Sequence, residues 1–292
     1  MRSRTGVVLM TYGSATTAEN VEAYFKHIYK NPSQEIIEDF KHRYELVGGS
    51  PLVSITKAQT ALLQEELGDD YIVCAGMRHS VPYISEAVAE CKKSGATKLR
   101  GVILSPQFSS FIMEGYKKDF AAAAATADIR EFSIAEPWPT EQSFIELLAE
   151  RVSDKLDELG KDTPVVFTTH SLPKRVVDKD PSYLEQLRMT TEAVLKKLPK
   201  IEWYSGYQSA GHTPEEWLKP DLVDILKDLQ EKKKDKVLIV PIQFLADHLE
   251  ILYDLDVAAR EQCEEFGIEY NRIELPNTDP LFIKTLAALS RK

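Results

Sequence analysis

The sequence contains little cysteine, and no two cysteines have a functional spacing. Only three occur among 292 residues, at Cys74, Cys91 and Cys263. None of the intervals between them matches a zinc knuckle or a redox motif. Separate thiols of this kind are typical of reduced side chains in a cytosolic protein, so we expect free thiols and no disulfide framework.

The sequence also lacks an excess of positive charge and a long apolar run. The formal net charge is -10, which argues against nucleic acid as a partner. The longest apolar run, residues 237–246, contains Pro241 and Gln243 and could not span a bilayer. At the N-terminus the apolar stretch is too short for the core of a signal peptide. We therefore expect a cytoplasmic protein that is not an integral membrane protein.

The length and the alternation of elements predict two α/β domains. A chain of 292 residues exceeds what one hydrophobic core usually spans. Apolar strand-like runs alternate with helical stretches, which favours parallel sheets with crossover helices. These runs are residues 6–11, 71–76, 99–105, 165–169, 201–206 and 237–241. Asp279 before Pro280 predicts a helix start, and residues 213–216 form a candidate capping box.

The two halves of the chain resemble each other. LRGVILSPQFSS at 99–110 matches DKVLIVPIQFLADH at 235–248 in pattern, and VVLMTYGS at 7–14 corresponds to VVFTTHSLP at 165–173. This echo predicts two similar doubly wound domains, each with a parallel sheet flanked by helices. The boundary is expected in the loop at 136–139. It separates an N-terminal α/β domain at 1–138 from a C-terminal α/β domain at 139–292, whose last helix can pack back on the first domain.

Polar side chains gather where the predicted strands end. In doubly wound sheets, ligands bind beyond the carboxyl ends of the strands, so these side chains are candidates for the site. Polar residues are also common wherever a strand becomes a loop, and some of them will have no chemical role. The candidates are Tyr12, His79, Gln107, His170, Gln208 and Asp247.

The leading pair is His170, after one apolar strand, and Glu250, after a later one. An imidazole and a carboxylate that face each other can hold a divalent metal or move protons. Asp247, Glu250 and Asp254 are spaced by three and four residues, which on an α-helix places them on one stripe. A structural histidine and a solvated acidic helix face would have the same pattern. The two residues together are therefore stronger evidence for a functional site than either residue alone.

Several segments resemble the signature regions of ferrochelatases, in order along nearly the whole chain. They are LMTYG at 9–13, RYELVGGSPL at 43–52, GMRHSVPYISEAV at 76–88, SPQFSSF at 105–111, THSLP at 169–173, WYSGYQSAG at 203–211, TPEEWLKPD at 213–221 and PIQFLADHLEILYD at 241–254. A tyrosine after the first strand, Tyr12, resembles the coproporphyrin III ferrochelatases of Gram-positive type bacteria.

This resemblance implies a class II chelatase-like fold and the insertion of ferrous iron into coproporphyrin III, giving coproheme in heme biosynthesis. Iron is then a substrate, and we expect neither a tightly bound cofactor nor an iron–sulfur cluster, because no terminal cysteine cluster is present. His170 and Glu250 are implied as catalytic residues and metal ligands. Tyr12 is implied as an axial ligand of the product iron, and Asp254 as a weaker metal ligand.

The resemblance also implies a set of residues that bind the substrate and its carboxylates. Three departures from the family pattern stand out. Tyr29, followed by Lys30, occupies the place of an arginine; Gly13, Ser14 and Ala15 replace Gly-Thr-Pro; and Ala258 replaces an acid. The substrate-binding candidates are Tyr12, Tyr29, Arg43, Tyr44, Ser50 and Tyr116, with Arg78, His79 and Lys117 as looser ones. A monomer is expected, with a coproheme-accepting protein as a candidate transient partner.

Three alternatives stay open at this point. A ferrochelatase of the same fold could act on protoporphyrin IX, or a related chelatase could act on sirohydrochlorin. A non-catalytic heme or porphyrin carrier would also need a two-lobed cleft with a tyrosine ligand. A two-lobed solute-binding protein is disfavoured because no export signal is recognised.

Overall fold

The computed structural model describes residues 3–211 and 214–292, which form two four-stranded sheets in which every strand pair is parallel. The first sheet contains β1 (Arg4–Thr11), β2 (Tyr71–Met77), β3 (Ala96–Ile103) and β4 (Phe132–Ile134), in the order β2-β1-β3-β4. The second contains β5 (Val165–His170), β6 (Trp203–Gln208), β7 (Lys236–Pro241) and β8 (Glu269–Arg272), in the order β6-β5-β7-β8. The two halves therefore repeat one strand order, which confirms the predicted fold class.

All six predicted strands are present, and the two that were missed are short edge strands. β4 has three residues and β8 has four, and only one residue of the two strands, Tyr270, is buried. Strands of three or four residues with almost no buried side chain contain no apolar run that a sequence pattern could reveal. The hydrophobic pattern of the sequence therefore gave no sign of them.

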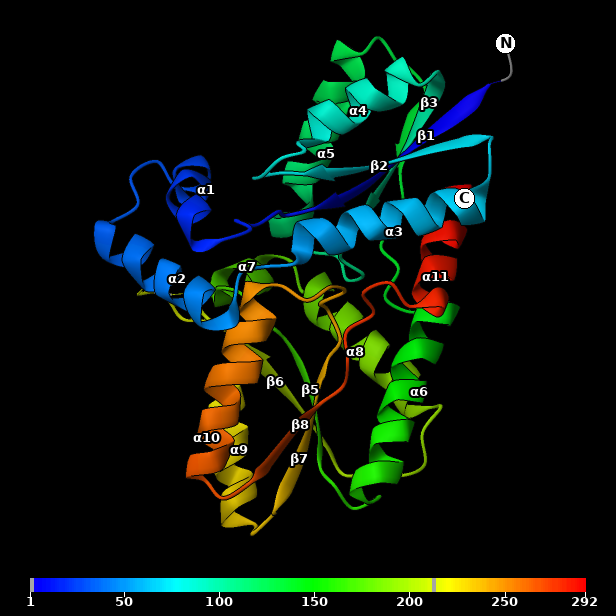
Figure 1. Ribbon diagram of the computed structural model, residues 1–292. Helices are drawn as coiled ribbons and strands as arrows, with labels where there is room; N and C mark the ends of the chain where they lie inside the picture. Colours follow the sequence, from blue (N-terminus) through cyan, green and yellow to red (C-terminus); the bar gives the residue numbers. More distant parts are fainter. Residues whose placement is uncertain (1–2, 212–213) are drawn as a thin grey trace.

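Helices cover both faces of each sheet (Figure 1). Asp279 caps the last helix as predicted, because its side chain accepts the N–H of Leu281 and Pro280 opens the helix. Thr213, in the expected capping box, lies outside the described residues. The helices are η1 (Ala18–Asn20), α1 (Val21–Ile28), α2 (Gln34–Val47), α3 (Leu52–Leu67), α4 (Ile84–Lys93), α5 (Ser110–Thr126), α6 (Gln142–Leu159), α7 (Lys174–Lys179), α8 (Ser182–Leu195), α9 (Leu222–Glu231), η2 (Glu250–Ala259), α10 (Arg260–Glu265) and α11 (Pro280–Arg291).

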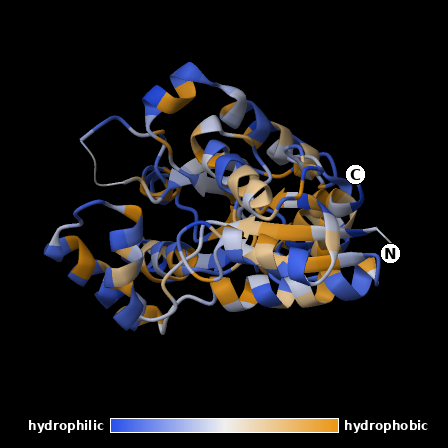
Figure 2. Ribbon diagram, turned by 90° about the horizontal axis from the view of Figure 1, so that it is seen from above, coloured by the Kyte–Doolittle hydropathy of each residue, from blue (hydrophilic) through white to orange (hydrophobic). Residues whose placement is uncertain are grey.

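Alternation along the central strands divides the interior into layers. Val8 and Met10 of β1 face α4 and α5, whereas Val7 and Leu9 face a cluster that also contains Val165 and other residues of the second sheet. Each such side chain contributes about 1.5–3 kcal/mol when it is fully buried. The hydrophobic strands lie centrally and more polar helix faces lie outside (Figure 2). One apolar cluster thus joins the two halves.

The last helix contacts both halves of the chain. α11 packs against α6 and also against α3 and β3 (Figure 1). The guanidinium of Arg100, on β3, donates from Nε to the carbonyl of Leu289 at 3.1 Å, and Arg291 donates to the carbonyl of Glu66. This helix therefore lies at the seam between the sheets, and the domain boundary at 138/139 stays a prediction.

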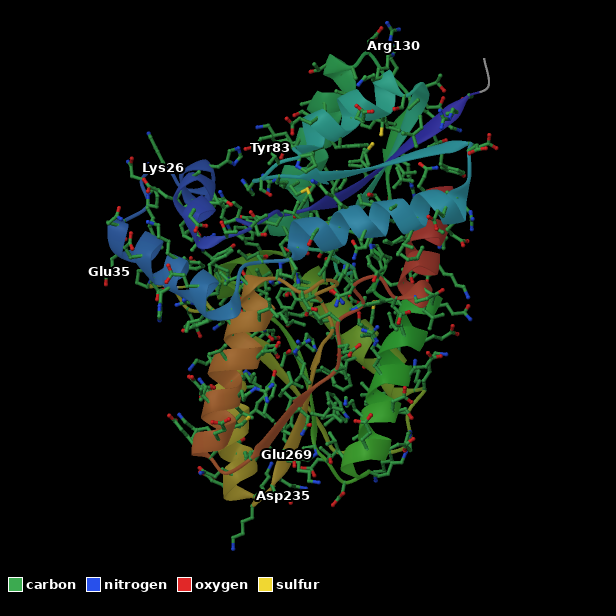
Figure 3. The ribbon with its side chains drawn as sticks, viewed as in Figure 1. Lys26, Glu35, Tyr83, Arg130, Asp235 and Glu269 are labelled. Atoms are coloured by element: carbon green, nitrogen blue, oxygen red, sulfur yellow. The ribbon has the colours of Figure 1, made fainter. Side chains whose placement is uncertain are left out.

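The segment that contains α1 and α2 projects from the first sheet and covers the start of η2. Phe25, Ile37 and Tyr44 form a small apolar cluster with Leu249, which directly precedes η2. Lys26 and Glu35 point outward from this segment (Figure 3). Asp235 and Glu269 lie at the far end of the second sheet, where β7 and β8 begin, so these strands run toward the first half (Figure 3).

The acidic segment forms a π-helix, η2, which corrects the predicted α-helical stripe. η2 begins at Glu250, so Asp247 lies in the preceding loop and does not share a helix face with Glu250 and Asp254. Hydrogen bonds in a π-helix join residues five apart, and such segments are frequent at functional sites. Within residues 3–211 and 214–292, no helix combines the length and apolarity needed to cross a bilayer.

Candidate active site

The chain places Tyr12 and His170 at corresponding points of its two halves. Tyr12 directly follows β1, and His170 is the last residue of β5. β1 and β5 are the second strands of sheets with the same order, so both side chains emerge at a carboxyl edge. Ligands bind at this edge in doubly wound sheets. The predicted location of the site therefore agrees with the fold.

The imidazole of His170 faces Glu250, with its Nε2 3.8 Å from Oε2 of the carboxylate. Its Nδ1 lies against the carbonyl oxygen of Ser171. A carbonyl can only accept, so Nδ1 carries the proton in this contact and Nε2 of the neutral ring keeps its lone pair. The two side chains are 29% and 43% exposed. The structure thus offers one nitrogen and one carboxylate, both accessible, as adjacent donors to a metal or acceptors for a proton.

His248 supports the start of η2 beneath this pair. The backbone N–H of Glu250 donates to its Nδ1 at 3.1 Å, which requires an unprotonated nitrogen there. Burial lowers the pKa of His248, against the opposing charges of Glu250 and Asp247. A neutral His248 therefore holds the backbone of Glu250. The adjacent Asp247 exchanges hydrogen bonds with Asn277 and lies 3.7 Å from Arg272, so it belongs to a structural network.

Asp254 lies one turn along η2 in a mostly desolvated position. Ser209 donates its hydroxyl to the carboxylate from a left-handed backbone conformation, φ 58°. Burial raises the pKa of Asp254 to about 6, and the charge of Glu250 adds to this while Ser209 and Arg43 oppose it. A carboxylate of this kind titrates near neutral pH, which suits a group that exchanges protons or cations.

Arg43 joins the α1–α2 segment to η2. Its guanidinium lies between the rings of Phe40 and Tyr253, at 5.0 and 4.8 Å from their centroids. It pairs with Asp39 at 2.8 Å and approaches Asp254 at 3.9 Å. Cation–π contacts of this kind are each worth about 0.5–2 kcal/mol. Arg43, which the sequence predicts to bind a substrate carboxylate, therefore also holds the α1–α2 segment against η2.

Tyr12 faces the site from the first half. Its ring is 42% exposed and lies 4.5 Å from that of His79. Desolvation, reinforced by Tyr29, raises the pKa of Tyr12 to about 12. Burial and the charge of Arg78 lower the pKa of His79 to about 4, so this imidazole is neutral. Tyr29 is 55% exposed, and partial burial together with the charge of Glu250 raises its pKa.

Three of the predicted substrate-binding residues are buried behind the surface of the site. Tyr44 is 2% exposed and Tyr116 is 4% exposed, and burial raises the pKa of both phenols. Ser50 is buried and its hydroxyl accepts a hydrogen bond from Ser14 at 3.0 Å. Arg78 covers the ring of Tyr116 at 5.3 Å. The structure therefore brings His170, Glu250, Asp254 and Arg43 together, whereas Tyr44, Ser50 and Tyr116 support the walls.

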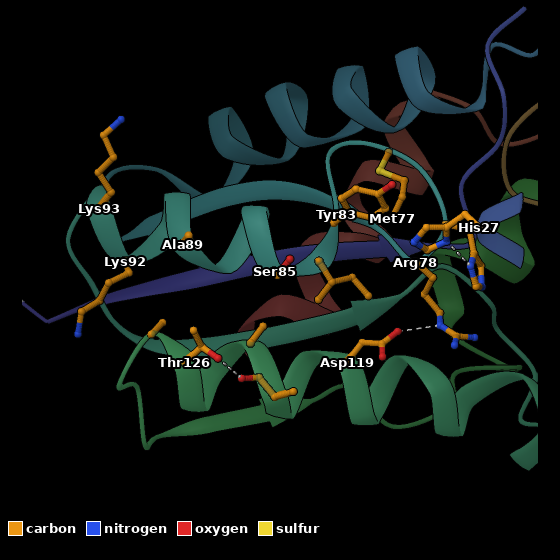
Figure 4. A pocket seen from close by; sticks show the side chains of 15 residues that line it. His27, Met77, Arg78, Tyr83, Ser85, Ala89, Lys92, Lys93, Asp119 and Thr126 are labelled. Atoms are coloured by element: carbon orange, nitrogen blue, oxygen red, sulfur yellow. Dashed lines mark hydrogen bonds and ion pairs between the residues drawn. The ribbon is translucent and has the colours of Figure 1, made fainter. Parts of the chain in front are cut away.

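A cavity lies beside this site, and its lining includes neither His170 nor Glu250. It measures about 770 Å³ and runs between α4 and α5, from Arg78 and His27 at one end to Lys92 and Lys93 at the other (Figure 4). Arg78 pairs with Asp119 at 3.0 Å inside it. His170 and Glu250 do not line this cavity. We therefore assign the active site from the geometry of this pair and not from the cavity. Among residues 3–211 and 214–292, no group of three His, Cys, Asp or Glu side chains is arranged around a metal position.

Four residues of the site were not candidates from the sequence. His248 and Ser209 contact Glu250 and Asp254, and Tyr183 and Gln243 contact the backbone of His170. Gln243 had a sequence signal, since it repeats Gln107 in the matching segments of the two halves. Tyr183 had none, because it lies on α8 and reaches His170 only through the tertiary fold.

Comparison with known proteins gives the family. A family model for ferrochelatase matches residues 4–292. The chain is 34% identical to the coproporphyrin III ferrochelatase of Halalkalibacterium halodurans, covering 100% of this chain and 97% of that protein, and 33% identical to that of Bacillus subtilis, covering 100% and 98%.

Solved structures show the same fold at low sequence identity. The chain resembles SirB from Bacillus subtilis with Fe3+, with a TM-score of 0.62 at 12% identity over 99% of this chain and 94% of that one. It also resembles CbiX, described as the terminal enzyme for biosynthesis of siroheme in denitrifying bacteria, with a TM-score of 0.57 at 12% identity over 99% and 98%. These structural similarities show the fold alone. The sequence similarity shows the family, and the chain belongs to the ferrochelatase family.

Proposed function

We propose that this ferrochelatase inserts ferrous iron into coproporphyrin III, and that the macrocycle binds between Tyr12 on one side and the His170–Glu250 pair on the other. The observation that carries the proposal is the facing pair itself, with Nε2 and Oε2 3.8 Å apart and both side chains partly exposed. The full-length similarity to coproporphyrin III ferrochelatases supports the choice of substrate.

Metal insertion makes three demands on the protein: iron must lose water, two pyrrole protons must leave, and the ring must be held so that its nitrogens can be reached. The pair supplies one nitrogen and one oxygen donor, a combination that suits a borderline metal such as ferrous iron. The same groups can accept protons once iron has passed. Asp254, with a pKa raised to about 6, is a second acceptor one turn away. Iron is a substrate of the proposed reaction, which needs no resident cofactor.

Tyr12 has a different role in the proposal. Its phenol lies on the wall of the first half and can bind the iron of the product axially once its proton has left. The raised pKa means that the free protein holds Tyr12 as a neutral phenol. Binding of iron must then supply the free energy of deprotonation.

The carboxylates of coproporphyrin require cations at the mouth of the site. Arg43 is one, and the sandwich between Phe40 and Tyr253 holds its guanidinium in place. Tyr29 stands where the family pattern has an arginine, and its hydroxyl can donate one hydrogen bond but carries no charge. We infer that Lys30, next to it, supplies charge at this edge.

Competition between porphyrins tests the proposed substrate. Purified protein under anaerobic conditions with ferrous iron is given coproporphyrin III, protoporphyrin IX or sirohydrochlorin, and metallation is followed by absorbance. We expect the highest kcat/KM for coproporphyrin III, since it has more carboxylates to meet the basic groups than protoporphyrin IX. Faster metallation of either alternative would contradict the proposal, and binding without turnover of any of them would indicate a carrier.

We further propose that the enzyme works in the cytoplasm as a monomer and transfers coproheme to an accepting protein. The open mouth supports direct transfer, because Tyr12 and Tyr29 are both exposed there.

A further inference from the structure

Side chains hold both backbone polar groups of His170. Its N–H donates to Oε1 of Gln243 at 3.0 Å, and its carbonyl accepts the hydroxyl of Tyr183 at 2.9 Å. The same hydroxyl lies 3.1 Å from Oε1 of Gln243, so the two holding groups also meet each other. Tyr183 comes from α8 and Gln243 from the loop after β7. Two separate elements therefore contact the backbone of one residue at the end of β5.

This arrangement is shielded from water. Tyr183 is 1% exposed and Gln243 is 7% exposed. Burial raises the pKa of the Tyr183 phenol, so the hydroxyl remains a donor throughout the working pH range, and the Thr169 side chain lies at the same oxygen. Buried hydrogen bonds that share partners restrict motion more than exposed ones, because no water replaces them when they break.

The corresponding glutamine of the first half has another use. Gln107 repeats Gln243 in the matching segments, yet its Nε2 donates to Thr190 at 3.0 Å and to the carbonyl of Ile242 at 3.2 Å. It ties the two halves together and makes no hydrogen bond to Tyr12, the counterpart of His170. A glutamine at this position of the repeated segment therefore does not by itself lead to a hydrogen bond with a residue of the site, as Gln243 makes with His170.

We propose that Tyr183 and Gln243 are positioning residues for the reaction: they fix the backbone of His170 so that Nδ1–H meets the Ser171 carbonyl and Nε2 faces Glu250. If the backbone moved, the Nδ1 contact would break and the ring could bind its proton on Nε2, the nitrogen that must stay free for a metal or a pyrrole proton. The inference rests on the proposed function, in which His170 acts through Nε2.

Tyr183→Phe tests this with little change in shape. We expect kcat/KM for ferrous iron to fall about tenfold, which corresponds to about 1.4 kcal/mol. The affinity for coproporphyrin III should not change, because the removed hydroxyl is buried away from the surface that meets the macrocycle. Tyr270→Phe is the matched control, since it removes another buried hydroxyl, which donates to Asp256 at 3.2 Å. It should leave turnover within about twofold, the scatter expected for independent sites.

A double-mutant cycle separates positioning from general damage. In a His170→Ala background, Tyr183→Phe should cause no further loss, because the residue it acts through is gone. An equal loss in both backgrounds, or no loss in the otherwise unchanged protein, would overturn the proposal.

Nitrogen NMR of the imidazole supplies a second readout that needs no activity. The His170 signals, assigned by their absence in His170→Ala, should report Nδ1–H in the unaltered protein and a population of Nε2–H in Tyr183→Phe. Unchanged tautomers would overturn the positioning role. If His170→Ala kept full activity, the proposed function would fail, and the NMR result would still decide whether Tyr183 positions the ring.

Discussion

Replacing Asp254 by asparagine should make the protein more stable at alkaline pH while it slows metallation. The carboxylate is 21% exposed, and burial raises its pKa from 3.8 to about 6. A carboxyl with a raised pKa favours folding in its neutral form. Its contribution is fully present below the unfolded pKa and is lost as pH rises through the folded pKa.

The structure sets the size of this effect. A shift of about two units at about 1.36 kcal/mol each means that ionised Asp254 costs about 3 kcal/mol at pH 8. The same linkage leaves a cost of about 1.5 kcal/mol at pH 5, where much of the carboxyl is protonated. In the Asp254→Asn variant, the side-chain amide oxygen can still accept a hydrogen bond from the hydroxyl of Ser209. The 3.9 Å approach of Arg43 is lost, but an ion pair of this length contributes less than about 1 kcal/mol.

Urea unfolding of Asp254→Asn and the unaltered protein at pH 8 and pH 5 measures the difference. We expect the variant to gain about 2–3 kcal/mol at pH 8 and roughly half as much at pH 5, with unchanged m-values. Asp228→Asn is the matched control: it makes the same substitution at an exposed site on α9 and should change stability by less than about 0.5 kcal/mol. A variant less stable than the unaltered protein at pH 8, or a gain that does not depend on pH, would show that burial of ionised Asp254 does not destabilise the fold.

Three further variants test other parts of the site. Tyr12→Phe should change the absorption spectrum of bound coproheme because the phenolate ligand is lost, and an unchanged spectrum would exclude axial ligation by Tyr12. Arg43→Met should cost about 1–2 kcal/mol of unfolding free energy through the lost cation–π contacts and should raise KM for coproporphyrin III; an unaltered KM would show that Arg43 serves only the fold. Tyr29→Arg adds a cation at the mouth and should tighten binding of coproporphyrin III about two- to fivefold at low salt, with the gain lost at high salt; a gain that persists at high salt would mean that charge is not its cause.

The repeated segments predicted the fold and the placement of Tyr12 and His170 at the ends of corresponding strands. An apolar strand followed directly by a polar residue occurs in both halves, and sequence records this local pattern directly. β4 and β8 were not predicted because they have three and four residues and almost no buried side chain.

The finer geometry of the site depends on contacts between distant segments. Asp247, Glu250 and Asp254 have α-helical spacing, but the chain forms a π-helix there, and a change of hydrogen-bond register leaves no mark in residue types. Tyr183 is 13 residues from His170 and reaches it across the fold. The sandwich of Arg43 between Phe40 and Tyr253 likewise joins two halves of the chain.

In the proposed reaction, His170 and Glu250 bind iron and accept the pyrrole protons. The most direct test is the rate of iron insertion by His170→Ala, measured anaerobically beside the affinity for coproporphyrin III from fluorescence quenching. We expect a rate at least about 100-fold lower, the smallest effect expected for a group that transfers protons in the reaction, and an affinity for coproporphyrin III within about twofold. Retention of the rate within about tenfold, or loss of porphyrin binding together with the rate, would contradict this role of the pair.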